Sequence, residues 1–98
     1  MAFVILTSKP GQFRTEPTQG VEPVESWDYL FCGKKRAAFT IAELHGPSRV
    51  RIIDETGPVN LVPTKFLEAF DSIEDARAEL QTLTAYRSMP VELRPATA

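Results

Sequence analysis

Cysteine and histidine are the residues this chain has least of, with one of each among 98 residues. A single cysteine, Cys32, cannot form a disulfide within the chain, and cysteine-ligated zinc or iron–sulfur centres need several thiolates. We therefore predict no metal and no cofactor. Because an unpaired thiol suits a reducing compartment, we also predict a cytoplasmic location.

Long apolar runs are missing as well. The run at residues 3–7 is much shorter than the ~20 residues that a membrane helix needs. No basic residue precedes it, as one would in a signal peptide. The sequence therefore predicts no membrane contact and no secretory leader.

A strong excess of one charge is also absent. Eleven basic and thirteen acidic residues give a net charge of −2, so no global field draws the chain to nucleic acid. The one basic cluster is Lys34, Lys35 and Arg36, with Arg51 expected on a neighbouring strand. A basic hairpin tip of this size is usually a solvated turn, and nucleic-acid binding is the weakest of our alternatives.

Catalytic patterns are not found. His45, the only histidine, lies in a Gly-Pro turn without a signalled nucleophile or orienting carboxylate. Gly11 and Gly20 are isolated, so there is no glycine-rich phosphate loop. Cations near Cys32 would favour its thiolate, but a buried, structural cysteine is the simpler interpretation. The sequence favours a protein that is not an enzyme.

What is present is the composition of one small globular domain, which we place at residues 1–94 with a frayed tail at 95–98. The β-branched run at 3–7 predicts a central strand covered on both faces. Residues 26–32 and 36–44 predict a hairpin, and 49–54 the third strand of a meander. Short strands at 59–62 and 89–93 would bring this antiparallel sheet to three to five strands.

A three-residue loop at 33–35 would place the large side chains of the hairpin on one face. The cross-strand pairs that it predicts are Phe31 with Ala37, Tyr29 with Phe39, and Trp27 with Ile41.

Helical periodicity follows the strands. A short helix is expected at 65–70, and a longer one from Ile73 to about Tyr86, with Ser72 as N-cap and Asp75 completing a capping box. We predict that this C-terminal helix packs on one face of the sheet, which makes the fold class α+β. Its apolar stripe consists of Ile73, Ala76, Leu80 and Leu83, and the sheet residues expected to face it are Trp27, Tyr29, Phe31, Phe39, Ile41, Val50 and Ile52.

Residues 9–25 contain three prolines and two glycines, and we predict an irregular loop there. Phe13 is its only large apolar side chain, and Arg14 lies next to it. The loop is either a mobile connection or a segment that binds a partner.

The function that we expect is that of a small accessory or binding protein acting through protein contacts, with a homodimer as one option. The hairpin face that carries Leu30, Ala38 and Ala42 would be open to such a partner. The first alternative is an anionic-ligand binding or enzymatic domain that uses the 9–25 loop, and the second is nucleic-acid binding at the basic tip. The candidate interaction residues are Phe13, Arg14, Lys34, Lys35, Arg36 and Arg51.

Overall fold

The structure of the protein is a computed structural model that describes residues 2–84 and 91–95. It has an α+β fold, with antiparallel sheets and a C-terminal helix as predicted. The elements are β1 (Ala2–Ser8), β2 (Phe13–Pro17), β3 (Val21–Phe31), β4 (Lys34–Leu44), β5 (Arg49–Asp54), β6 (Val59–Pro63), the 3₁₀ turn η1 (Thr64–Phe66), α1 (Ile73–Thr84) and β7 (Val91–Pro95).

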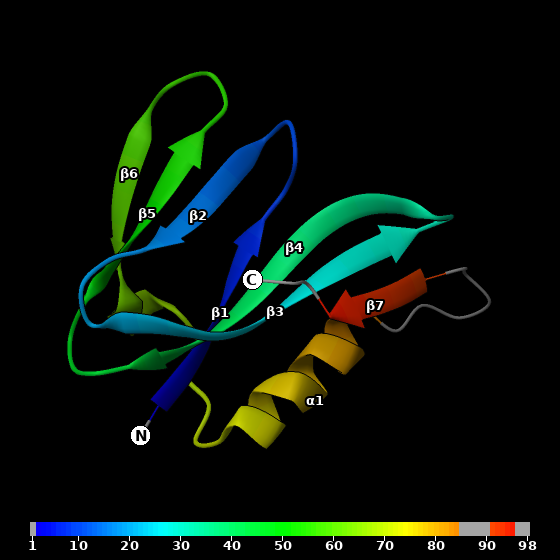
Figure 1. Cartoon of the computed structure of the whole chain (residues 1–98). Coiled ribbons are helices and arrows are strands. Elements are labelled where there is room, and N and C mark those ends of the chain that lie inside the picture. Colours follow the sequence, from blue (N-terminus) through cyan, green and yellow to red (C-terminus); the bar gives the residue numbers. More distant parts are fainter. Residues whose placement is uncertain (1, 85–90, 96–98) are drawn as a thin grey trace.

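The strands form two sheets (Figure 1), with the orders β1-β4-β3-β7 and β2-β5-β6. The predicted single meander is therefore wrong, because β5 pairs with β2 and β6 and does not pair with β4. β1 lies at the edge of its sheet and is not central, although it is covered on both faces as expected. Its continuous apolar run reflects a layer on each side of the sheet.

The helix covers one face of the four-stranded sheet. Phe39 and Ile41 of β4 pack there with Ala76 and Leu80 of α1. Partly buried side chains surround them, namely Phe3, Ile5, Trp27, Tyr29, Phe70, Ile73 and Leu93. The predicted stripe is confirmed for Ile73, Ala76 and Leu80, whereas the side chain of Leu83 and the helix end at Tyr86 lie outside the described residues.

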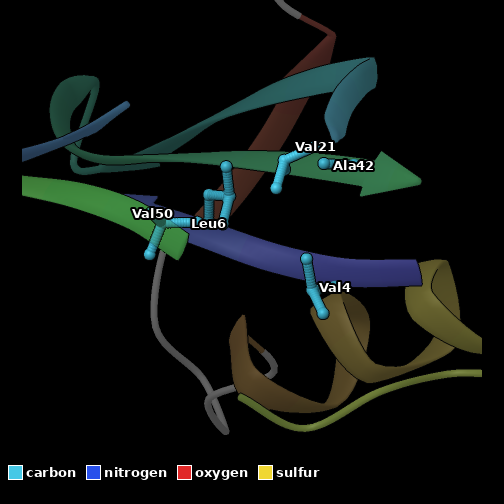
Figure 2. Close-up of a cluster of buried hydrophobic side chains, with 5 residues drawn as sticks. All are labelled: Val4, Leu6, Val21, Ala42 and Val50. Atoms are coloured by element: carbon cyan, nitrogen blue, oxygen red, sulfur yellow. The ribbon is translucent and has the colours of Figure 1, made fainter. Parts of the chain in front are cut away.

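The three-stranded sheet covers the opposite face. Figure 2 shows the second core cluster, in which Val4 and Leu6 meet Val21, Ala42 and Val50. The prediction that Val50 and Ile52 belong to the helix-facing set is wrong, since Val50 lies in this cluster and Ile52 lines a hollow between the two sheets. Ala42, expected on an open face, is 0% exposed because the second sheet packs over it. Successive side chains of β1 and β4 therefore belong alternately to the two core clusters.

The β3–β4 hairpin turns in two residues. Cys32 and Gly33 have φ of 53° and 78°, the two positive values that a type I′ turn requires. Tyr29 pairs with Ala37 and Trp27 with Phe39, so the predicted three-residue loop and its register are wrong. The register shift between Tyr29 and Leu30 keeps the aromatic residues on one face. Cys32 is exposed in the turn, which overturns its expected burial.

The segment 9–25 is not an irregular loop. It contains a turn at Gly11 that joins β1 to β2, the strand β2, and a turn at Gly20 that joins β2 to the start of β3. Its prolines are tolerated because β2 is an edge strand and Pro23 lies at a register shift of β3.

The predictions for the C-terminal third of the chain are confirmed in part. The Ser72 hydroxyl accepts a hydrogen bond from the Asp75 N–H at 3.1 Å, which confirms the predicted N-cap. The expected helix at 65–70 is wrong, because only η1 forms and Phe70 makes an extended bridge with Phe3. β7 confirms an added edge strand, and Pro95 belongs to it; residues 89–90 and 96–98 lie outside the described residues.

Candidate interaction surface

The predicted basic tip is separate from Arg51. Lys34, Lys35 and Arg36 follow the β3–β4 turn, and Lys35 Nζ lies 3.1 Å from Asp28 Oδ1. Arg51 is on β5, in the other sheet. The four residues therefore do not form the continuous basic patch that adjacent strands would have produced.

Arg51 instead lies near Arg14 on the outer face of the three-stranded sheet. Glu16 joins them, with Oε2 at 3.2 Å from Arg14 Nε and Oε1 at 3.8 Å from Arg51 Nη1. Phe13 is half-buried, on the side of β2 that faces the other sheet, where it lines a hollow of about 160 Å³. It is thus a part of the packing between the sheets and not an exposed anchor.

A larger hollow of about 330 Å³ lies between the β4–β5 turn and the segment around η1. This volume is at the low end for ligand pockets. Its lining residues are mostly apolar, and Lys65 is the one charged residue among them. Arg14, Arg36 and Arg51 do not line it, so the pocket expected of the anionic-ligand alternative is not formed there.

His45 is half-exposed and paired with carboxylates. Its Nε2 lies 2.9 Å from Glu22 Oε2 and 3.6 Å from Glu43 Oε1, which links the start of β3 to the end of β4. Among residues 2–84 and 91–95, the side chain of His45 contacts these carboxylates and no nucleophile, and the same residues hold no cluster of acidic, histidine or cysteine side chains suited to a metal ion.

The most exposed apolar side chains lie outside the predicted interaction residues. Val59 and Leu61 of β6 are 54% and 52% exposed, and Phe66 of η1 is 71% exposed, with Lys65 Nζ 5.3 Å from its ring centre. We call these three residues the β6–η1 surface. The sequence shows only that residues 59–63 carry no charge, and the structure adds that they form an edge strand.

The backbone of β6 is open along its outer edge. The Asp54 N–H donates to the Pro58 carbonyl and the Thr64 N–H to the Ser48 carbonyl, both at 2.9 Å. The backbone N–H and C=O groups of the even-numbered residues in this stretch therefore point toward β5, and those of Val59 and Leu61 point outward. In the part of the chain that is described, no strand pairs with this edge. Pro63, which lacks an N–H, occupies an outward position where none is needed.

No helix among the described residues is long and apolar enough to cross a membrane. Comparisons of the chain with protein-family models, with curated proteins and with solved structures gave no significant match.

Proposed function

We propose that this chain is a small, non-enzymatic accessory protein that binds proteins through the β6–η1 surface. The observation that carries the proposal is the position of the exposed apolar residues. Of the four large ones in the described residues, Val59, Leu61 and Phe66 fall within eight consecutive positions, and only Val24 lies elsewhere. Clustered exposed apolar residues mark contact sites more often than scattered ones.

The open edge of β6 adds support from the backbone. Unpaired N–H and C=O groups can accept an extended segment of a partner, and alternate side chains then provide specificity. Natural edge strands often carry charge that prevents such pairing, and β6 carries none. The proposal includes a cytoplasmic location, for which the support is the single thiol of Cys32.

The two alternatives have less support. Binding of an anionic ligand needs several cations that point into one pocket. Lys65 is the one charged residue among those that line the 330 Å³ hollow. For nucleic acid, the tip is small, Lys35 is paired with Asp28, and the chain is net acidic.

The test uses three baits in an extract of the native host: the wild type, a Leu61→Lys/Phe66→Ser variant, and Val24→Lys as a matched control. Val24 is 46% exposed and lies on β3, so its substitution introduces the same charge away from the surface. We expect the wild type and Val24→Lys to retain partner proteins that the double variant does not retain. When such a partner protein is titrated, its affinity for the double variant should be at least ten-fold weaker than its affinity for the wild type. An identical set on all three baits would rule out this surface.

A further inference from the structure

We propose that the β6 edge also pairs with a second copy of the same chain, antiparallel and two-fold symmetric, joining two three-stranded sheets into one of six strands. The inference rests on the proposed function in one respect only, since it assigns an occupant to the same surface. A two-fold interface requires a surface that is complementary to itself, and three properties of β6 meet this requirement.

The first property is the hydrogen-bonding pattern. With Leu61 at the two-fold axis, the outward N–H and C=O of Leu61 in each copy face those of the other, as in a hydrogen-bonded antiparallel pair. Val59 then lies opposite Pro63 of the second copy, where its N–H can donate to the proline carbonyl. The missing N–H of Pro63 falls at the end of the ladder, where its loss is tolerated.

The second property is charge. Asp54 at the end of β5 and Glu55 in the following turn precede β6, whereas Lys65 follows the strand and Arg49 lies opposite Pro63. Antiparallel pairing brings the acidic end of each copy beside the basic end of the other. A parallel arrangement would bring like charges together, so the charges select the antiparallel one.

The third property is the side-chain rows on the outer face. Leu61 pairs with Arg51 of β5, which shares the carboxylate of Glu16 with Arg14. In the dimer the two Leu61 side chains meet at the axis, and each Val59 meets Pro63 of the second copy. The charged residues beside this contact are Arg51, opposite Leu61, and Arg49, opposite Pro63.

A contact between two five-residue strands belongs to the small, transient class of interfaces, which bury less than about 1,200 Å². Association should therefore depend on concentration. We expect sedimentation velocity to show a monomer at low micromolar and a growing dimer fraction toward millimolar protein. Leu61→Lys should remain a monomer throughout, and Val24→Lys should associate as the wild type does, with circular dichroism confirming that both are folded.

A charge exchange tests the antiparallel direction. Lys65→Glu and Glu55→Lys should each weaken association several-fold at low salt, and the double exchange should restore it. A wild type that stays a monomer at every concentration, or a dimer that Leu61→Lys leaves intact, would overturn the proposal.

The two proposals fail separately. A strictly monomeric wild type whose protein partners are still lost by the Leu61→Lys/Phe66→Ser variant would refute self-pairing and leave the proposed function. A dimer that Leu61→Lys abolishes, with partner capture unchanged in all baits, would refute the proposed function and support self-pairing.

Discussion

At the scale of single residues, Gly20 is the one glycine at which an added Cβ would meet another side chain. Its φ is 89°, and its carbonyl accepts the His45 N–H at 2.8 Å, which joins the β2–β3 turn to the end of β4. Ser48 Oγ lies against it and donates to the Gln19 carbonyl at 3.0 Å. A glycine is needed here for both its backbone conformation and the space beside Ser48.

Gly20→Ala should lower the free energy of unfolding by about 1–2 kcal/mol from the left-handed backbone alone. The new Cβ would also collide with Ser48 Oγ, so the loss should be smaller in a Ser48→Ala background. Urea denaturation of the four proteins of this double-mutant cycle measures both effects. Gly11→Ala is the matched control, because its φ is 78° and a Cβ there meets open space. Equal losses at Gly20 and Gly11 would contradict the contact with Ser48.

Local sequence signals predicted some residues correctly and others wrongly. Ser72 could be predicted as a cap because its partner, Asp75, is three residues away. The role of Gly20 depends on Ser48, which only the tertiary fold brings near. The position of Cys32 is not predictable from the local sequence, because a type I′ turn with cysteine at its first central position lacks the usual Asn-Gly or Asp-Gly signature.

At the scale of elements, one ion pair fastens α1 to β3. Arg77 donates to Glu25 through Nε at 2.8 Å and Nη2 at 2.7 Å, and Trp27 Nε1 donates to the same carboxylate at 2.8 Å. The hydrogen bonds from Arg77 lower the pKa of Glu25 most; burial opposes this, and the Trp27 hydrogen bond and the charge of Arg77 add to the lowering. The helix is thereby held by a polar contact beside its apolar stripe.

This lowered pKa predicts a pH dependence of stability. As the pH falls, Glu25 takes up a proton in the unfolded chain at a higher pH than in the folded protein. The stability that the ion pair contributes is therefore complete above the unfolded pKa of about 4.3, and it is lost as the pH falls through the lower, folded pKa. The wild type should therefore lose more stability than Glu25→Gln between about pH 6 and pH 3. Thermal denaturation across this range measures the difference.

Glu68→Gln serves as the control, since Glu68 is exposed. Its stability curve should run parallel to that of the wild type, and Arg77→Gln should flatten the curve as Glu25→Gln does. If Glu25→Gln and Glu68→Gln gave the same pH profile, the ion pair would have no role in fastening the helix.

The elements that the sequence predicted well are those with strong periodicity. α1 and the arms of the hairpin follow from their apolar spacing. β2 was missed because its proline and its polar composition resemble those of a loop, although an edge strand tolerates both. The candidate surface was missed for a related reason: the exposure of Leu61 depends on which sheet β6 joins, and no local pattern determines that.

At the scale of the whole molecule, the four-stranded sheet contributes side chains to both core clusters, one on each of its faces. Ile41 and Ala42 are neighbours in β4, yet Ile41 packs toward α1 and Ala42 toward the other sheet. A strand common to two clusters cannot loosen on one side without affecting the other. We therefore expect the three layers to unfold in one cooperative transition.

Leu80→Ala tests this coupling from the helix side. Leu80 is 2% exposed, and its truncation should cost about 2–5 kcal/mol, against about 5–15 kcal/mol for the stability of a typical domain. Trp27 fluorescence reports the helix-facing cluster, and hydrogen exchange of the Val50 amide reports the other sheet. In Leu80→Ala, the free energy of unfolding measured by each of the two probes should fall by the same amount. Gln81→Ala, at an exposed position one residue further on, should leave both values unchanged. A Val50 amide that kept its wild-type protection while the Trp27 transition shifted would show that the two clusters unfold separately. The shared sheet would then not be enough to couple them.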